Sequence, residues 1–255
     1  MDNTQNFTGL ANDYTIGRPV YATAFIKHLY TKCGFTDQSV IADIGSGTGK
    51  FAKQLLDKGS FVYCVEPNDD MRNTAISELS GYKNFQARKG SATETTLQER
   101  EVDFITTAQA FHWFDVFGFR TECSRILKEN GKVVLVWNMR DMTSPVNQEC
   151  FEVYKKYCPK FKGFGGGIQK DDARIKEFFG CGYEYVEVEN DLFYDRDTFI
   201  SRSLSGSYSL KRGDENYSEY IGELEQIFDK YARAEILTMK NNTVAYIGAI
   251  KDDKK

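Results

Sequence analysis

Residues 43–50 have the sequence Asp-Ile-Gly-Ser-Gly-Thr-Gly-Lys, a turn rich in glycine. The apolar run before it, Ser39–Ile44, has the character of a buried strand, and a helical pattern follows from Lys50 to about Lys58. Glycine lets the chain change direction between strand and helix, and it lets a ligand approach the bare backbone. These residues therefore predict a strand, a turn and a helix, with a candidate ligand site at the turn.

The alternation of strands and helices continues beyond this unit. Further strand patterns are Phe61–Glu66, Phe85–Arg88, Val102–Thr107 and Lys132–Trp137, helical patterns run from Asp70 to about Leu79 and from Val116 to Leu127, and a turn is expected at Glu129–Gly131. Apolar strands separated by helices are typical of an α/β fold with a mostly parallel sheet and helices on both faces. Ligands of such folds bind outside the carboxyl ends of the strands.

The pattern changes after residue 139, which divides the chain into three expected parts. Residues 1–139 would form an N-terminal segment and the ligand-binding core, and residues 140–182 a lid insertion with a helix at Cys150–Tyr157 and the glycine-rich stretch 163–167. Residues 183–255 would supply the final strands, with a helical contribution to the lid at about 190–235. We expect one of the closing strands to be antiparallel.

Composition excludes several classes of protein. The 255 residues carry a formal charge of −4, which does not suit a nucleic-acid binder or an anionic membrane surface. No apolar run approaches the ~18 residues of a membrane span, and the N-terminus lacks the pattern of a signal peptide. Six cysteines without a CxxC pair, and two histidines, show no zinc-binding spacing. We therefore expect a cytoplasmic protein with reduced thiols and no metal.

The glycine turn has several possible ligands. A Walker A loop would need glycine at position 44 and serine or threonine at position 51, where Ile44 and Phe51 stand. A dinucleotide fingerprint would need a small residue in place of Lys50. A GxGxG turn preceded by an acid, Asp43, fits the residues, and a glycine turn without any ligand is the remaining alternative.

Glu66 is the second candidate ligand residue. It ends the second predicted strand, 17 residues after Gly49, where a carboxylate could accept hydrogen bonds from both hydroxyls of a ribose. The alternative is a charge at the start of the following helix, a role that Asp69 or Asp70 could also fill.

These motifs resemble the class I S-adenosylmethionine-dependent methyltransferases. The turn with Asp43 resembles their motif I, and the block Ala108–Asp115, with sequence Ala-Gln-Ala-Phe-His-Trp-Phe-Asp, resembles a subgroup that includes trans-aconitate methyltransferase-like proteins. The N-terminal segment from Asn6 through Tyr14 to Arg18-Pro19 and the stretch Arg125–Gly131 resemble the same subgroup. The resemblance covers residues 7–138. One departure is that many members carry an acid beside the residue that matches Ala92, whereas this chain has Ser91 before it and Thr93 after it.

The resemblance implies a Rossmann-like sheet that binds S-adenosylmethionine. The implied cofactor contacts are Tyr14, Arg18, Asp43, Gly45, Ser46, Gly47, Thr48, Gly49, Glu66, Met71, Ser91, Ala92, Gln109 and Ala110. Arg18 would pair with the carboxylate of the cofactor. Methyl transfer to a small-molecule acceptor follows as the expected activity, in a monomer or weak homodimer. A non-catalytic or regulatory methyltransferase-like protein, or a nucleic-acid methyltransferase, is the alternative.

His112 is the candidate catalytic residue. A hydroxyl or amine acceptor must lose a proton, and a histidine can accept one near neutral pH. A carboxylate acceptor needs only to be positioned, in which case His112 would be a packing residue.

The expected lid is basic and aromatic. It contains Arg140, Arg174, Arg196, Arg202, Lys211 and Arg212 together with Tyr154, Tyr157, Tyr194 and Tyr208. Guanidinium groups bind carboxylates through paired hydrogen bonds, so these residues suit a small carboxylate or other anionic or amphipathic acceptor. The alternative is a charged surface exposed to solvent.

Overall fold

Seven strands form one sheet in the part of the chain that the structure, a computed structural model, describes: residues 19–180, 182–206 and 208–250. The order is β3-β2-β1-β4-β5-β9-β6. The bounds are β1 (Val40–Ile44), β2 (Phe61–Val65), β3 (Phe85–Arg88), β4 (Val102–Ala108), β5 (Leu127–Arg140), β6 (Glu184–Glu189) and β9 (Asn241–Gly248). Only β9 runs against its neighbours, β5 and β6, within this sheet. The expected α/β class, mostly parallel with one antiparallel strand, is confirmed.

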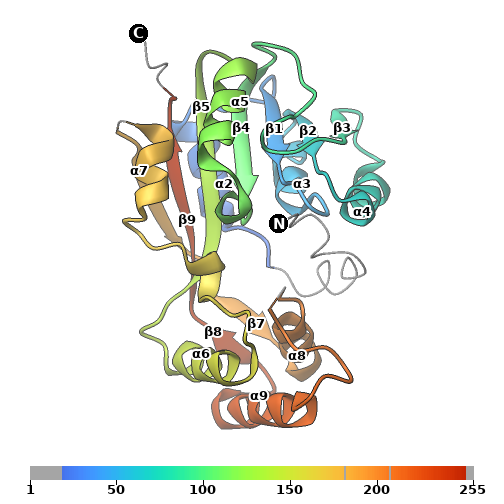
Figure 1. The fold of residues 1–255 in the computed structure, drawn as a ribbon, viewed down its shortest axis with the longest axis vertical. Coiled ribbons are helices and arrows are strands. Elements are labelled where there is room, and N and C mark those ends of the chain that lie inside the picture. Colours follow the sequence, from blue (N-terminus) through green and yellow to red (C-terminus); the bar gives the residue numbers. More distant parts are fainter. Residues whose placement is uncertain (1–18, 181, 207, 251–255) are drawn as a thin grey trace.

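Helices cover both faces of the sheet (Figure 1). One face carries α2 (Thr23–Lys32), α3 (Lys50–Leu56) and α4 (Asp69–Leu79), and the other carries α5 (Val116–Ile126) and α7 (Ala173–Phe179). Each face of the sheet packs against its helices in a hydrophobic core, and strand β5 contributes to both cores. Val134 and Val136 belong to the core on the side of α2, α3 and α4. Val133, Leu135 and Trp137 belong to the core on the side of α5 and α7. Burial on both faces explains why this strand is apolar at successive positions.

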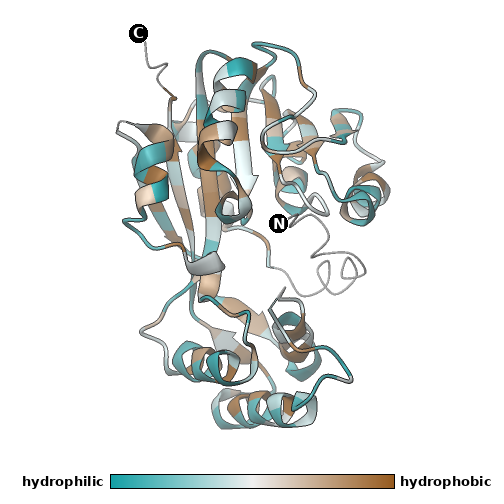
Figure 2. Cartoon of the chain, viewed as in Figure 1, coloured by the Kyte–Doolittle hydropathy of each residue, from teal (hydrophilic) through white to brown (hydrophobic). Residues whose placement is uncertain are grey.

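A smaller unit, which we call the small lobe, lies beyond the carboxyl end of β5 (Figure 1). It consists of α6 (Pro145–Tyr157), α8 (Arg196–Leu204), α9 (Tyr217–Tyr231) and the antiparallel pair β7 (Leu192–Tyr194) and β8 (Leu237–Met239). These elements share a third core. Figure 2 shows the mixture of polar and apolar residues along its helices, as expected for helices with one buried side. None of the helices in the described ranges is long and apolar enough to cross a membrane.

The stretch expected as a lid insertion, residues 140–182, is divided between the two units. Helix α6 belongs to the small lobe, whereas α7 packs on the sheet through Ile175, Phe178 and Phe179. The sequence patterns did not reveal α7, because three apolar residues in a seven-residue helix make a weak periodic signal. Helix α2 was not predicted either.

The turn expected at Glu129–Gly131 lies inside β5 in the structure. Asn130 has a φ of 64°, and the pairing of β5 with β4 changes register between Val102 and Phe104. Asn130 and Gly131, residues that are common in turns, thus lie in an irregular part of a long strand.

Candidate active site

The glycine turn between β1 and α3 is held against the end of β2. The N–H groups of Gly45 and Ser46 donate to the carbonyl oxygen of Val65, at 2.9 and 3.3 Å, and Gly49 N–H donates to Ser46 O at 3.0 Å. Gly45 has a φ of 69° and Gly49 a φ of 80°, a backbone conformation that favours glycine. The turn is therefore held by its own backbone hydrogen bonds and by those to β2.

The turn also packs closely on two other segments. A Cβ on Gly45 would lie 2.8 Å from Ala110 Cβ and 3.1 Å from Phe114 Cζ. A Cβ on Gly49 would lie 2.6 Å from Leu79 Cδ1 in α4. Side chains at these positions would separate the elements. The structure thus brings together the turn and the block after β4, as their places at the carboxyl ends of neighbouring strands predicted.

Glu66 turns toward the glycine turn. Its Oε2 accepts a hydrogen bond from Gly47 N–H at 2.9 Å, and its Oε1 accepts one from Asn68 N–H at 2.9 Å. Burial raises the pKa of Glu66, against the lowering effect of these two N–H groups. Asn68, not Glu66, caps α4, because its side chain accepts from the N–H of the buried Met71 at 3.0 Å.

Asp43 lies beneath the turn. It is fully buried at the end of β1, and its Oδ1 accepts a hydrogen bond from Thr106 Oγ1 in β4 at 2.8 Å. Burial raises the pKa of Asp43 to about 7, although the Thr106 hydrogen bond lowers it. Asp43 therefore links two strands below the turn. Thr48, expected as a contact on the turn itself, is also buried.

The segment after β4 places Gln109 and Ala110 beside the turn. Gln109 has a φ of 58°, its N–H donates to Val136 O at 2.9 Å, and its Nε2 donates to Asn138 O at 3.2 Å. His112 follows in the short helix η2 (Phe111–Trp113), with its ring centroid 4.9 Å from that of Trp113. A cavity of about 30 Å³ adjoins the turn, lined by Pro19, Tyr21, Ser46, Lys50, Phe51, Ala108 and Gln109.

A second glycine-rich segment covers His112. Helix η3 (Phe164–Gly167) lies where β5 leaves the sheet, and a Cβ on Gly166 would lie 2.2 Å from His112 Cδ2. A Cβ on Gly165 would lie 2.5 Å from Met139 Sδ. Both glycines have a positive φ, 63° at Gly165 and 71° at Gly166. This segment was expected as a flexible part of the lid; the structure shows it in contact with the candidate catalytic residue.

The remaining predicted contacts are less closely connected to the turn. Ser91 and Ala92 are half-buried after β3, where Ser91 N–H donates to Glu94 O at 2.9 Å. No interaction of these two residues with the glycine turn is present among the described residues. Tyr14 and Arg18 lie outside the described residues.

Sequence reasoning missed a polar network at the carboxyl end of β5. Asn138 Oδ1 accepts hydrogen bonds from Thr243 Oγ1 at 2.9 Å and from Asn190 Nδ2 at 3.0 Å, and its Nδ2 donates to Val20 O at 3.2 Å. Thr243 Oγ1 also accepts from Ala22 N–H at 2.9 Å. The network ties residues 20–22 to the strands that border the site. Its members are far apart in sequence, and only the polar stretch Asn241–Thr243 could have signalled it.

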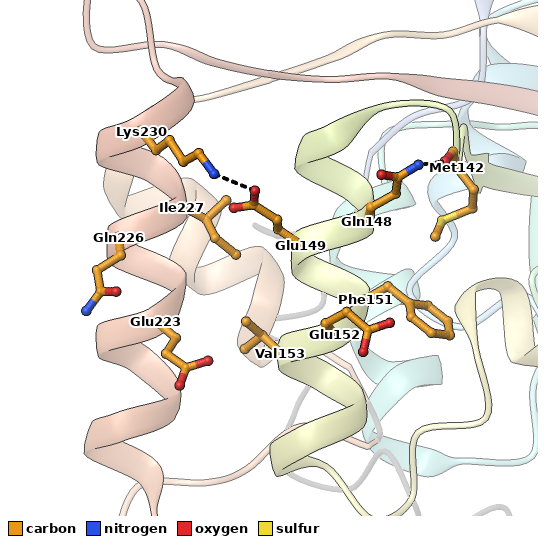
Figure 3. A pocket seen from close by; sticks show the side chains of 10 residues that line it. All are labelled: Met142, Gln148, Glu149, Phe151, Glu152, Val153, Glu223, Gln226, Ile227 and Lys230. Carbon is orange, nitrogen blue, oxygen red and sulfur yellow. Dashed lines mark hydrogen bonds and ion pairs between the residues drawn. The ribbon is translucent and has the colours of Figure 1, made fainter.

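A larger groove, of about 880 Å³, lies between α6 and α9 of the small lobe (Figure 3). Its walls carry the ion pair of Lys230 with Glu149 at 2.6 Å and a hydrogen bond from Gln148 Nε2 to Met142 O at 2.8 Å. The lining residues are Met142, Gln148, Glu149, Phe151, Glu152, Val153, Glu223, Gln226, Ile227 and Lys230. Since none of them belongs to the glycine turn or to the block after β4, the groove is separate from the candidate site.

One group of possible metal ligands occurs among the described residues, although the sequence showed no metal-binding spacing. The ligand atoms of His28, Cys33 and Glu184 lie within 4.8 Å of one another. His28 Nε2 and Glu184 Oε1 are 3.1 Å apart, and burial raises the pKa of the Cys33 thiol to about 11. The thiol is therefore protonated at neutral pH. These residues lie on α2, its carboxyl end and β6, outside the candidate site.

Comparisons with known proteins agree with this geometry. Residues 42–135 match a family described as a methyltransferase domain. The chain is 27% identical over 229 residues to an uncharacterized methyltransferase of Schizosaccharomyces pombe, an alignment that covers 88% of this chain and 87% of that protein.

Solved structures share the fold. The YcgJ protein of Bacillus subtilis has a TM-score of 0.57 at 16% identity and covers 91% of this chain and all of its own. A SAM-dependent methyltransferase of Geobacter sulfurreducens, solved with S-adenosylhomocysteine, has a TM-score of 0.51 at 13% identity and covers 97% of this chain and 98% of its own. At these identities the likeness is one of fold.

We predict that Asp43→Asn changes how stability depends on pH. The pKa of Asp43 is about 7 in the folded protein and near 3.8 in the unfolded chain. Between these two pH values the folded protein keeps a proton on Asp43 that the unfolded chain has released. The free energy of unfolding of the parent should therefore fall as pH rises through this window, by up to about 1.4 kcal/mol per pH unit. Asparagine keeps an acceptor for Thr106 and does not ionise, so the variant lacks this fall.

The measurement is urea unfolding at several pH values from 4 to 7.5. The stability of Asp43→Asn relative to the parent should increase with pH, whereas Glu78→Gln, an exposed change on α4, should leave the profile unaltered. A constant difference between Asp43→Asn and the parent across this range would contradict the assignment.

We also predict that Gly166→Ala destabilises the protein more in the parent than in a His112→Ala background. Gly166 has a φ of 71°, so the change strains the backbone in both backgrounds, but only in the parent does the new methyl group overlap the His112 ring. That overlap should cost about 1–3 kcal/mol. Urea unfolding of the parent, the two single variants and the double variant measures this difference. Equal losses in the two backgrounds would show that η3 does not lie against His112.

Proposed function

We propose that this chain, residues 42–135 of which match a methyltransferase domain, transfers the methyl group of S-adenosylmethionine to a small anionic acceptor held between the sheet and the small lobe. The observation that carries the proposal is the meeting of Glu66, the glycine turn and the His112 segment at the carboxyl ends of β1, β2 and β4. This is the place where open α/β sheets bind their ligands.

The residues present fit the cofactor. Each oxygen of Glu66 accepts one backbone hydrogen bond and has a further lone pair, so the carboxylate could also accept from the two hydroxyls of a ribose. The positive φ and missing side chains of Gly45 and Gly47 leave backbone exposed to a ligand on the turn. Gln109 and Ala110 border the turn from the β4 side.

The cofactor, when bound, supplies a methyl group on a positively charged sulfur. The chain's task is then to hold an acceptor atom in line with that methyl group and to exclude water. His112 is half-buried and lies against η3, two residues after Ala110, which contacts the turn. This position supports a role for His112 beside the acceptor. We assign it the removal of a proton from a hydroxyl or amine acceptor.

The first test of this proposal uses Glu66→Gln. Loss of the charge and of one acceptor oxygen should weaken the binding of S-adenosylhomocysteine about 10- to 100-fold, measured by isothermal titration calorimetry. Asp69→Asn is the control, because Asp69 is an exposed acid nearby that pairs with Lys89 at 3.2 Å. Binding as tight as in the parent would return Glu66 to a purely structural role at the turn.

The second test concerns His112→Gln. An acceptor is first found by following labelled methyl groups from S-adenosylmethionine into small acids, phenols and amines. On a hydroxyl or amine acceptor the variant should lower kcat about 10²- to 10⁴-fold and lose the rise of kcat with pH, while its affinity for S-adenosylhomocysteine is retained. His28→Gln makes the same change at the other histidine of the chain and should leave kcat unaltered. If His112→Gln keeps both turnover and pH profile, His112 is not the base.

A further inference from the structure

A nitrogen, a sulfur and an oxygen donor meet where the carboxyl end of α2 lies against β6, an edge strand of the sheet. They belong to His28, Cys33 and Glu184, and the three ligand atoms lie within 4.8 Å of one another. His28 Nε2 is 3.1 Å from Glu184 Oε1, although the two residues are 156 positions apart in the sequence. The fold therefore brings together donors that no short motif connects.

Regular structure places each of the three side chains. His28 lies within α2, and Cys33 ends this helix, with its N–H donating to Leu29 O at 3.2 Å. Glu184 begins β6 on the same side of the strand as Val186 and Val188, which pack against the core that contains α2. Cys33 is buried, the side chain of His28 is 25% exposed and that of Glu184 is 52% exposed. The group is thus anchored at the thiol and open to solvent at the carboxylate.

This mixture of donor atoms suits zinc. Zn²⁺ binds imidazole nitrogen, thiolate sulfur and carboxylate oxygen at about 2.0–2.3 Å in a tetrahedron, whereas Ca²⁺ and Mg²⁺ prefer oxygen alone. In such a tetrahedron the ligand atoms are about 3.3–3.6 Å apart. The largest separation in the group, 4.8 Å at most, exceeds this range by about 1 Å, a distance that side-chain rotation can close.

The charges of the group also match a divalent cation. A thiolate and a carboxylate together carry two negative charges, and a neutral imidazole adds none, so a complex with Zn²⁺ has no net charge. A complex without net charge is less costly to bury than an isolated ion. The carbonyl groups at the carboxyl end of α2 favour a cation beside them. Lys132 Nζ already donates to one of these carbonyl oxygens, that of Cys33, at 3.4 Å.

We propose that His28, Cys33 and Glu184 bind one Zn²⁺ ion, with a water molecule as the fourth ligand, and that the ion joins α2 to β6. This inference is independent of the proposed function. Bonds form from the ion to Nε2, Sγ and Oε1, and the hydrogen bond between His28 and Glu184 is lost. The imidazole carries its hydrogen on Nδ1, which leaves the lone pair of Nε2 for the metal. The Cys33 thiol, which is protonated at neutral pH, releases its proton to solvent.

The ion would fasten the second end of α2. The residue before this helix, Ala22, is already tied to β9 through its N–H, which donates to Thr243 Oγ1 at 2.9 Å. Strand β6 is hydrogen-bonded to β9 and lies at the edge of the sheet, where strands open most readily. A metal bridge from α2 to Glu184 should therefore protect β6 from local opening.

The first experiment measures zinc binding to the full chain. The protein is reduced, freed of metal with a chelator that is then removed, and titrated with zinc chloride in competition with a chromogenic chelator. The parent should bind one Zn²⁺ ion per chain. His28→Gln and Cys33→Ser should each weaken binding about 100-fold or more, because loss of even an outer partner of a metal ligand costs about 10- to 100-fold. Glu184→Gln should weaken it about 10-fold, because water can replace an exposed ligand.

Two matched variants serve as controls. Cys158→Ser changes another buried free cysteine, and Glu189→Gln changes an exposed acid of β6 on the opposite side of the strand from Glu184. Both should retain the zinc affinity of the parent. The proposal is wrong if the parent binds no zinc, if the three ligand variants bind it as tightly as the parent, or if the controls lose as much affinity as the ligand variants.

Cobalt identifies the atoms that hold the metal. Zn²⁺ has a filled d shell and no visible spectrum. Co²⁺ added to the metal-free parent should give the strong visible bands of a four-coordinate ion and a charge-transfer band from thiolate to metal. Cys33→Ser should lose the charge-transfer band, and Cys158→Ser should keep it. A charge-transfer band that persists in Cys33→Ser would assign the metal to another thiol and overturn the proposal.

Thermal unfolding separates loss of the site from loss of the fold. Without metal, the Tm of His28→Gln and of Glu184→Gln should stay within about 4 °C of the parent, because an exposed ion pair contributes little. Zinc should raise the Tm of the parent and of both controls, and should slow amide hydrogen exchange in β6, but should do neither in His28→Gln. This variant decides the question if Cys33→Ser, a change at a buried residue, does not fold. An equal rise of Tm with zinc in the parent and in His28→Gln would refute the site.

Discussion

The close contact between Gly45 and Ala110 is the constraint on which the candidate site depends. A Cβ added to Gly45 would lie only 2.8 Å from Ala110 Cβ, so a side chain at position 45 would force the two segments apart. The contact joins the turn after β1 to the segment after β4. Through that segment it sets the place of His112, and through the turn it sets the place of Gly47, whose N–H orients Glu66. This contact thus helps to position both the candidate cofactor residues and the candidate base.

Strand β5 extends this arrangement into the small lobe. Its middle residues alternate between the two cores of the sheet, so this part of the strand is buried on both faces. Asn138, near its end, is the centre of the hydrogen-bond network that holds residues 20–22. Arg140, its last residue, lies beside Phe164 and Met239, which belong to or pack against the core of the small lobe. One strand therefore carries core positions and an anchoring position in succession.

The parts that could be predicted from sequence depend on local chemistry. The three glycines of the turn have positive φ, and the apolar strands alternate with helices at ordinary spacing, so the α/β fold and the place of Asp43 and Glu66 follow from short windows. The parts that could not be predicted depend on residues distant in sequence. The partners of Asn138 come from both ends of the chain. Arg174 pairs with Asp172, whereas the adjacent Asp141 of Arg140 accepts hydrogen bonds from Thr143 instead, a difference that the sequence alone does not show.

The site proposed here binds S-adenosylmethionine through the glycine turn and Glu66, and does not bind another nucleotide. Isothermal titration calorimetry of the purified chain with S-adenosylhomocysteine, NAD and ATP tests this assignment. We expect saturable binding of S-adenosylhomocysteine with one site per chain and no comparable binding of NAD or ATP. Micromolar binding of NAD, with none of S-adenosylhomocysteine, would contradict it.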